Sequence, residues 1–485
     1  MSKLKKNVLY NGVLTGSNLI LPFIIFPYIT RVLEPEGIGQ INFANSFIQY
    51  FVIISSLGIP FYGIREIAKV RDNTAQRTTI LFELFSIKFI CSLIAIVIYL
   101  FLIFSVDKFN DYLAYYLLGL GTIVIGIFDL NYFFSALEDF KYITLRSVFF
   151  QIVSIIATFV LIKTKDDSLI YFCIPIIISL LNTLVNTKYI FKFIDFSVIK
   201  SKLQLRSHIK PLFLLFSVMV FTSVYNLLDV TLLGFLSGNS SVGYYSVASK
   251  INKIPLSLIM VLVPVMLPRI AMEFKKENYI EINRLISKTI QFVILLGVPI
   301  MVGLFVTAPE IISLFSGAEF APSVDTIRIM SPIVLIIGIT TNFSTQFLVP
   351  LGKDRQLLYA VIYGTVTSVV LNFILIPLFQ HNGAAFSNLF AELVVLFACY
   401  YYVKKYMQIS IPFKQIIINT ILCLPFLGFV LISRQLLSSA FLVLFFSVTI
   451  SIVYYLTIQI LILKNSIMVE LKNTTQNKLQ SIFKF

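Results

Sequence analysis

The alternation of basic residues around long apolar stretches is the feature that most limits how this 485-residue chain can fold. About fourteen apolar stretches follow one another, most of them about twenty residues long, which is the length of helix that crosses the hydrocarbon core of a bilayer. Of the 38 basic residues, we assign 29 to the termini and to every second gap between these stretches, counting two that lie at the adjoining span ends. Basic loops stay on the cytoplasmic side. We therefore predict an all-α polytopic membrane protein with both termini in the cytoplasm.

Each predicted span begins and ends with one apolar stretch. They cover residues 8–30, 38–62, 79–104, 112–134, 145–163, 169–191, 211–236, 243–268, 289–309, 326–350, 357–378, 383–403, 415–433 and 438–463.

Composition excludes a soluble globule, because 58% of the residues are hydrophobic, only 13% are charged and the mean hydropathy is +0.92. The net charge of +15 raises the alternative of nucleic-acid binding. The basic residues are scattered over many short loops, so we attribute the charge to topology and to contact with anionic lipid headgroups. We predict membrane lipids as partners and no nucleic acid.

The chain offers few residues for catalysis or for cofactor binding. Its four cysteines all lie in apolar spans without a CxxC pair, and we expect small buried hydrophobes rather than disulfides. His208 and His381 lie alone in separate loops, where surface histidines are expected rather than ligands. No gap is long enough for a soluble catalytic domain, so we predict a protein that is not an enzyme and holds no cofactor. Coupling to H+ or Na+ is left open.

The chain matches itself at an offset of 204 residues, in predicted spans 2 and 8. The matches pair Gly39 with Gly243, Ala44 with Ala248, Pro60 with Pro264 and Arg65 with Arg269. Six spans separate the copies, so both insert in the same orientation. This predicts two six-helix lobes with a cavity between them, as in transporters built from repeats. The predicted domains are residues 1–200 (spans 1–6), 201–405 (spans 7–12) and 406–485 (spans 13 and 14 with the tail).

Both copies carry a polar stripe on one helical face. In span 2 it contains Asn42, Asn45 and Gln49; the offset leads from these to Ser246, Ser249 and Lys253, and from Ser46 to Lys250. Polar groups are costly against lipid and usually face the bundle interior or a wet cavity. Asparagine and serine also join helices by hydrogen bonds, and this alternative stays open for span 2. For span 8, with its two lysines, we favour the cavity.

Charges inside the spans are the candidates for a binding site. Lys253 lies about 15 Å into span 8 at 1.5 Å per residue, whereas Lys250 is shallower and close enough to reach the interface by snorkelling. Asp229 is placed to pair with Lys250 across a tight hairpin, either as part of the site or as a structural ion pair. Glu392 is the best carboxylate for ion coupling, and a structural hydrogen bond is an equal alternative.

Four further charges are assigned by their position near span ends. Lys88 looks central, but we favour snorkelling, and Asp129 is expected at the cytoplasmic interface. Arg31 and Arg328 flank the outer side, where either is able to anchor a helix end. Lysine and arginine bind phosphate through charge-assisted hydrogen bonds. We therefore expect Lys253, Lys250 and Arg31 to hold an anionic substrate group.

Several segments resemble the Wzx-type polysaccharide flippases. The likeness lies in Ile29-Thr-Arg31-Val-Leu33 with Pro35-Glu-Gly37-Ile-Gly39, in Asp229 with Val242–Ile251, and in Leu351-Gly352-Lys353. It extends over about residues 5–460 and departs from the family at Glu34, where a glycine is expected. The resemblance implies the MATE-like superfamily, with two six-helix lobes and spans 13 and 14 outside them. It also implies that Arg31, Asp229, Lys250 and Lys253 are functional.

The function implied by this resemblance is the transfer of undecaprenyl-pyrophosphate-linked oligosaccharide across the bacterial plasma membrane by alternating access. Polymerase and chain-length proteins of the same pathway would then be partners. A cation-coupled drug exporter of the same superfamily is an alternative, although it favours an acidic pocket. A membrane polymerase or ligase is expected to carry a long outer loop with catalytic residues, and a channel does not fit the two-lobe duplication.

Overall fold

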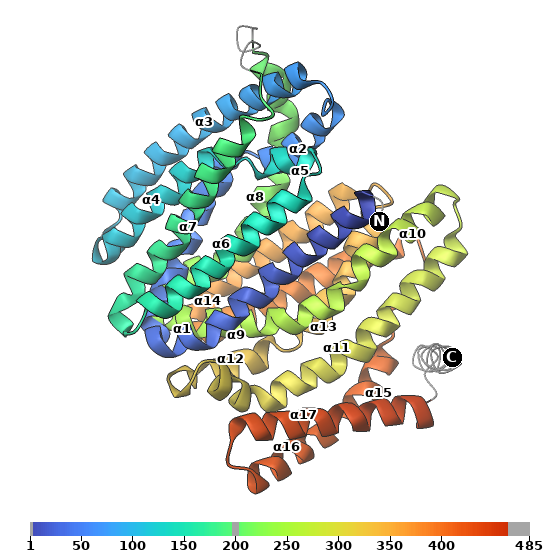
Figure 1. The fold of residues 1–485 in the computed structure, drawn as a ribbon. Coiled ribbons are helices and arrows are strands. Elements are labelled where there is room, and N and C mark those ends of the chain that lie inside the picture. Colours follow the sequence, from blue (N-terminus) through green and yellow to red (C-terminus); the bar gives the residue numbers. More distant parts are fainter. Residues whose placement is uncertain (1–2, 196–202, 464–485) are drawn as a thin grey trace, which may run out of the picture. The chain divides into compact units, whose positions relative to one another are not determined.

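The computed structural model describes residues 3–195 and 203–463, which form helices and connecting turns with no strand in those ranges. Contacts between Cα atoms divide the chain into two compact units, Met1–Ser246 and Val247–Phe485. The division falls within helix α9 (Asn239–Met260), so each unit is described by itself (Figure 1). The three domains predicted from the duplication follow a different criterion and stay a prediction.

Unit 1 contains eight helices of the α type before α9 in the part of the chain that the structure describes. They are α1 (Lys3–Ser56), α2 (Ile59–Lys69), α3 (Thr74–Ser105), α4 (Leu113–Ile127), α5 (Asn131–Ala136), α6 (Phe140–Leu161), α7 (Ser168–Ile190) and α8 (Leu205–Leu236). A short 3-10 helix, η1 (Asp107–Tyr112), leads into α4.

Unit 2 continues from α9 with the remaining helices. They are α10 (Leu262–Lys275), α11 (Tyr279–Phe315), α12 (Ser323–Met330), α13 (Ile333–Phe343), α14 (Asp354–Lys404), α15 (Phe413–Cys423), α16 (Pro425–Leu436) and α17 (Ala440–Thr457).

Helix starts in both units are set by side chains that satisfy the free amides of the first turn. The Asn73 side chain accepts a hydrogen bond from the Gln76 amide at 3.1 Å at the start of α3. Asn278 does the same for the Glu281 amide at 3.2 Å at the start of α11. These polar caps lie in the gaps between apolar stretches, so α3 and α11 begin at Thr74 and Tyr279, before the predicted spans that start at 79 and 289.

Two long helices are bent at single residues with positive φ. Helix α1 bends at Glu34 (φ 57°, ψ 177°) and α14 bends at Gln380 (φ 51°, ψ −127°). Both bends lie in gaps between predicted spans, namely between spans 1 and 2 and between spans 11 and 12. Glu34 is the position where the family resemblance calls for glycine, and its backbone conformation is one that only glycine adopts easily.

Ten helices in the described residues are long and apolar enough to cross a membrane. Two of them, residues 9–69 and 354–404, each contain two of the predicted spans. Helix α9 is not among the ten, since its polar stripe reduces its apolar character. The prediction of an all-α multi-pass membrane protein is confirmed, whereas the count of fourteen spans and the cytoplasmic termini stay predictions.

Lys88 shows how a charge is accommodated inside unit 1. Its side chain is 4% exposed, and its ammonium donates a hydrogen bond to the Asp129 carbonyl at 3.1 Å. Helix α4 ends before α5 begins, so this carbonyl lies between the two helices and is available as an acceptor. Lys88 is therefore buried with a backbone partner, and the expectation that it snorkels to the interface stays a prediction. Asp129 itself is half-buried and accepts from the Asn131 amide.

In unit 2, ion pairs and amide networks fasten helices to one another. Arg434 on α16 donates to both carboxylate oxygens of Glu310 on α11, at 2.6 and 3.0 Å, and Glu310 is 7% exposed. Asn419 on α15 accepts hydrogen bonds from Tyr455 and Gln459, which lie near the end of the chain's last described helical segment. The ion pair attaches α16 to α11, whereas the Asn419 contacts join α15 to α17 and to the segment that follows it.

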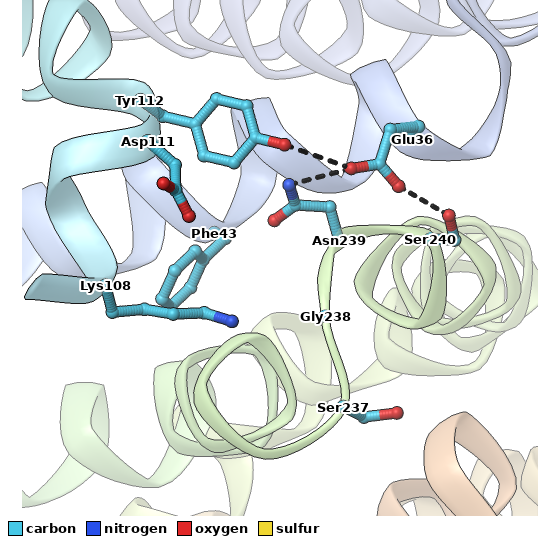
Figure 2. Close-up of a pocket in the computed structure, with 9 residues that line it drawn as sticks. All are labelled: Glu36, Phe43, Lys108, Asp111, Tyr112, Ser237, Gly238, Asn239 and Ser240. Atoms are coloured by element: carbon cyan, nitrogen blue, oxygen red, sulfur yellow. Dashed lines mark hydrogen bonds between the residues drawn. The ribbon is translucent and has the colours of Figure 1, made fainter.

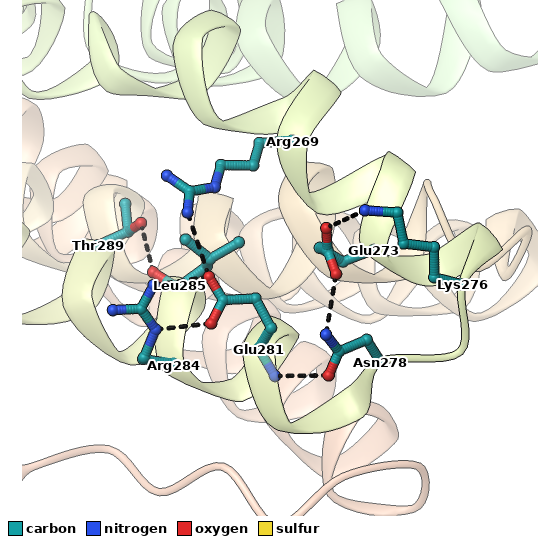
Figure 3. A network of polar contacts seen from close by, with 8 residues as sticks. All are labelled: Arg269, Glu273, Lys276, Asn278, Glu281, Arg284, Leu285 and Thr289. Atoms are coloured by element: carbon teal, nitrogen blue, oxygen red, sulfur yellow. Dashed lines mark hydrogen bonds and ion pairs between the residues drawn. The ribbon is translucent and has the colours of Figure 1, made fainter.

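The turn from α10 to α11 carries a second polar network (Figure 3). Arg269 pairs with Glu281 at 3.2 Å, and Glu281 also accepts from Arg284. The hydrogen bond from Lys276 lowers the pKa of the neighbouring Glu273 carboxyl. Arg65, the position equivalent to Arg269 in the first copy, also pairs with a glutamate, since it lies 3.0 Å from Glu66. Both copies therefore place an ion-paired arginine at the same helix end.

Candidate functional site

Unit 1 brings equivalent segments of the two sequence copies into direct contact. A Cβ atom added at Gly39 would lie 1.7 Å from the Asn239 carbonyl oxygen, and one added at Gly243 would lie 2.1 Å from the Pro35 carbonyl oxygen. Gly39 and Gly243 are equivalent at the offset of 204, and so are Pro35 and Asn239. Gly39 packs on Asn239, and Gly243 packs on Pro35. The two contacts are therefore equivalent to each other. The contact has the pattern of a local two-fold axis, as in self-complementary interfaces.

Only glycine permits this approach, because backbones meet where a side chain would stand. Small residues allow membrane helices to approach closely in the same way. The part of α1 that follows the Glu34 bend contributes Pro35, Glu36 and Gly39, while the start of α9 contributes Asn239, Ser240 and Gly243. We call these six residues the repeat contact.

Glu36 provides the polar bonds of the repeat contact (Figure 2). Its carboxylate accepts hydrogen bonds from the Ser240 hydroxyl at 2.5 Å and from the Asn239 amide at 2.9 Å. A third, longer bond comes from the Tyr112 hydroxyl at 3.4 Å. Ser240 is itself the position equivalent to Glu36, since 204 residues separate them. An acceptor in one copy thus meets a donor in the other at the local axis.

A polar cavity of about 300 Å³ adjoins the repeat contact. Glu36 and Asn239 line one side, and Lys108 and Asp111 line the other, with the Tyr112 ring between them (Figure 2). Ser237, Gly238 and Ser240 complete the lining together with Phe43. The cavity places the Glu36 carboxylate within reach of water or of a polar ligand.

Aromatic side chains form an apolar layer next to this cavity. Phe43 makes an edge-on contact with Phe235, with ring centroids 5.2 Å apart, and Phe109 contacts Phe47 at 4.5 Å. Gly234 permits the packing, since a Cβ there would lie 2.2 Å from the Phe43 ring. Below the layer, the Thr231 hydroxyl donates to the buried Ser46 hydroxyl at 3.1 Å. The repeat contact and the aromatic layer together close this end of unit 1.

The predicted polar stripe of span 2 lies on α1 beyond the bend. Asn45 and Gln49 are exposed, and Asn42 is half-buried with its amide donating to the Ile38 carbonyl at 2.8 Å. Ser46, on the neighbouring face, is 3% exposed. Two members of the stripe are thus open while the third is bonded within its own helix.

The equivalent stripe lies on α9, which runs unbroken through all four positions. Ser246 and Ser249 are half-buried, whereas Lys250 and Lys253 are exposed. Among the described residues, Lys253 has neither a hydrogen bond nor an ion pair. Ser246 belongs to unit 1 and the other three to unit 2, so their assignment to one cavity stays a prediction.

The remaining predicted residues are dispersed over both units. Asp229 is 3% exposed and accepts a hydrogen bond from the Tyr245 hydroxyl at 2.7 Å. Arg31 is exposed on α1, three residues before the bend, and Glu392 is half-buried on α14. Arg328 pairs with Asp325 at 3.1 Å and stacks on the Phe305 ring, which is consistent with the anchoring role considered for it. The functional roles of these residues stay predictions.

The two histidines do not lie where they were predicted, and Glu36 was not among the predicted site residues. His208 and His381 are 8% and 9% exposed and lie within α8 and α14, so neither is a surface histidine. Both lie close to the ends of apolar stretches, where the sequence alone places the helix boundary poorly. A signal for Glu36 was present, since the offset that relates Gly39 to Gly243 also relates Glu36 to Ser240.

Comparisons with known proteins agree with this architecture. A family model described as “Polysaccharide biosynthesis protein” matches residues 4–274, and a model described as MatE matches residues 215–374. A protein of Escherichia coli (strain K12) named “Putative O-antigen transporter” is 25% identical over 400 residues, which is 81% of this chain and 94% of that protein. “Lipid II flippase MurJ” of Bacillus subtilis (strain 168) is 25% identical over 178 residues, which is 36% of this chain and 32% of that protein.

Solved structures share the fold at low sequence identity. “Lipid II flippase MurJ, inward closed conformation” aligns with a TM-score of 0.76 and 18% identity over 95% of this chain and 100% of that chain. An inward-facing MATE family transporter of the MOP superfamily aligns with a TM-score of 0.62 and 12% identity over 79% and 93%. The MATE-like architecture expected from the sequence is therefore confirmed. Since the family model spans more than half of the chain, this protein belongs to the polysaccharide biosynthesis protein family.

Proposed function

We propose that this protein is a flippase for surface polysaccharide biosynthesis. Its substrate would be an undecaprenyl-pyrophosphate-linked oligosaccharide, moved from the inner to the outer leaflet of a bacterial plasma membrane. The family assignment supports this proposal, and so do the relatives named “Putative O-antigen transporter” and “Lipid II flippase MurJ”. Capsule, O-antigen and exopolysaccharide pathways all use such a step, and the proposal covers the three. Polymerase and chain-length proteins would be its partners.

The observation that carries the proposal is the repeat contact. It joins the two copies through glycine backbones and a few hydrogen bonds to one exposed carboxylate, Glu36. A contact of this kind separates at a modest free-energy cost, because water replaces the hydrogen bonds to the carboxylate when the helices part. Transporters built from repeats work by rocking one repeat against the other. We infer that the repeat contact is the outer seal of an alternating-access cycle.

Substrate binding is proposed on the α9 lysines and on Arg31. Lys253 is exposed and has no ion pair among the described residues, so its ammonium is available to a pyrophosphate group. A charge without a partner on a membrane helix is costly unless it serves a ligand or a wet path. The lipid chain would stay in the bilayer while the sugars cross with the pyrophosphate.

The test is the Lys253→Ala variant in a strain that depends on this protein for its surface polysaccharide. We expect surface polysaccharide to be lost while the protein level in the membrane is unchanged, and Lys253→Arg to restore part of it. Lys165→Ala is the matched control, because Lys165 is also an exposed lysine but lies in the short helix η2 (Lys165–Asp167) and belongs to neither the repeat contact nor the proposed site. Normal polysaccharide in Lys253→Ala cells would refute the site assignment.

A cation-coupled drug exporter is the second candidate, favoured by the match of the MatE model to residues 215–374. Glu392, half-buried on α14, would then be the coupling carboxylate. The two candidates differ in the consequence of deletion. Loss of a flippase removes surface polysaccharide and leaves drug sensitivity unchanged, whereas loss of an exporter raises the cellular content of a fluorescent cationic drug.

A further inference from the structure

Three buried titratable side chains form a continuous hydrogen-bonded chain in unit 1, away from the repeat contact. The His208 Nε2 atom lies 2.8 Å from a Glu83 carboxylate oxygen, and its Nδ1 atom lies 2.8 Å from the Tyr62 hydroxyl. Tyr62, Glu83 and His208 are 4%, 5% and 8% exposed. They come from α2, α3 and α8, so the chain ties three helices together. It lies at the helix ends that the sequence analysis assigns to the cytoplasmic side.

The pattern of donors and acceptors accommodates two protonation states. Glu83 accepts a hydrogen bond from the Gln204 amide at 2.6 Å through one oxygen, and its other oxygen lies 2.8 Å from His208 Nε2. When Glu83 is a carboxylate, Nε2–H is the donor to that oxygen. His208 Nδ1 faces a hydroxyl, a group that is both donor and acceptor. With a neutral ring, Tyr62 donates to Nδ1; with a charged ring, Nδ1–H donates to Tyr62. One proton is therefore bound or released without any heavy atom moving.

The charged groups around this chain have other partners or face outward. On α2, Arg65 pairs with Glu66 and lies 5.3 Å from the Tyr62 ring centroid. On α3, Arg77 donates to the Phe193 carbonyl and Lys88 to the Asp129 carbonyl. On α8, Arg206 and Lys210 are exposed, and the Asp195 amide binds Thr78. Within the described residues, Glu83 and His208 are thus the charged pair among the three hydrogen-bonded side chains. Proton uptake by His208 changes the net charge of the three from −1 to zero.

The second sequence copy lacks this arrangement. The offset of 204 leads from Tyr62 to Met266 and from Glu83 to Ser287, and neither residue reproduces the bonds. The fold of a lobe therefore does not require the chain of three. Burying a carboxylate beside a neutral imidazole is unfavourable, whereas the ionised pair is compensated. The free-energy cost of burying the Glu83 carboxylate is expected where this carboxylate has a functional role.

We propose that Tyr62, Glu83 and His208 form a proton-binding clasp that holds the start of α8 against the first lobe. Uptake of one proton from the aqueous phase at His208 Nδ1 gives the ionised His208–Glu83 pair and tightens the clasp. Loss of that proton leaves an uncompensated buried carboxylate and loosens the start of α8. The consequence for transport rests on the proposed function: the proton would then bias the rearrangement of α8. The clasp itself does not depend on that proposal.

The chain has only two histidines, which makes the clasp directly observable. In the full-length protein with His381→Gln, ¹⁵N-histidine NMR reports on His208 alone. We expect Nε2 to carry a proton between about pH 5 and pH 9, and Nδ1 to gain one as the pH falls. In a Glu83→Gln variant the charged ring should appear only at lower pH. A ring whose Nδ1 state does not change over this range, or is the same in both proteins, would overturn the proposal.

Hydrogen exchange tests the mechanical part of the clasp. After correction for the intrinsic pH dependence, amides of residues 205–212 should open about tenfold less often at pH 5.5 than at pH 8.5, since protonation turns the existing His208–Glu83 hydrogen bond into an ion pair. Glu83→Gln should abolish this difference, and Tyr62→Phe should reduce it. Residues 440–447 of α17 serve as the internal control. An equal pH response in the parent and Glu83→Gln would contradict the clasp.

Surface polysaccharide in cells separates the two proposals. If the NMR and exchange results hold but Glu83→Gln cells make normal polysaccharide at all external pH values, the clasp is a structural device and its link to transport fails. If Lys253→Ala cells are also normal, the flippase proposal fails while the clasp remains.

Discussion

Glu36→Ala is the most informative perturbation, because it removes the polar bonds of the repeat contact without changing its glycines. The carboxylate makes two well-formed hydrogen bonds, to Ser240 and Asn239, and one long bond to Tyr112. A hydrogen bond to a charged group contributes about 1.5–3 kcal/mol net, and exposure of the carboxylate reduces this to about 1 kcal/mol for each bond. The two short bonds therefore sum to about 2 kcal/mol. If the contact opens in a two-state manner, its open fraction should rise about thirtyfold.

Cysteine labelling measures this open fraction. Ser46 lies ten residues beyond Glu36 on α1 and is 3% exposed, so a cysteine there is protected while the contact is closed. In a background in which the four native cysteines are replaced, Ser46→Cys should react with a membrane-impermeant maleimide about thirtyfold faster when Glu36→Ala is added. Asp111→Ala is the matched control. It removes a carboxylate that lines the same cavity but has no hydrogen bond among the described residues.

An unchanged labelling rate in Glu36→Ala would refute the reasoning, because it would mean that the bonds to Ser240 and Asn239 do not hold the contact closed. An equal increase in Asp111→Ala would also refute it, since the effect would then come from the charge of the cavity rather than from those bonds.

Two further predictions concern Gly39 and Glu34 and are checked by thermal unfolding of the purified protein. Gly39→Ala should lower the free energy of unfolding by about 1–3 kcal/mol, because its Cβ meets the Asn239 backbone. Gly428→Ala on α16, whose Cβ meets nothing within 4 Å, should be neutral or stabilising, and equal losses in both would contradict the close approach. Glu34→Gly should raise the stability by about 1 kcal/mol, since it relieves a positive φ at some cost in chain entropy. Glu34→Ala keeps the strain and should give no such gain.

The parts of the fold that depend only on the order of apolar and polar residues along the chain were predicted correctly. The gaps at Glu34 and Gln380 and the multi-pass class follow from the apolar pattern, because a bilayer demands long apolar helices with satisfied backbones. The family resemblance also located the bend, since a glycine was expected at Glu34. The physical cost of placing a glutamate there became visible only with the backbone angles.

Sequence reasoning about sites was less successful, because the partners of a polar side chain lie far away along the chain. The partner of Lys88 is a carbonyl 41 residues later, where α4 has ended. His208 was expected at the surface, yet it meets Glu83 from 125 residues earlier. Neither partner follows from periodicity, which reports which face a residue occupies but not what packs against that face.

The alternation of apolar spans and basic loops determined by itself that this chain crosses a membrane many times, since that pattern reflects only the cost of moving charge and backbone into lipid. The internal offset of 204 also indicated by itself that the two halves share an ancestor and an orientation. Only the tertiary structure decided that the two copies meet at Gly39 and Gly243 and that Glu36 binds them together. The reason is physical: close backbone approach and hydrogen-bond geometry depend on where helices bend and cross, and single residues such as Glu34 set those bends.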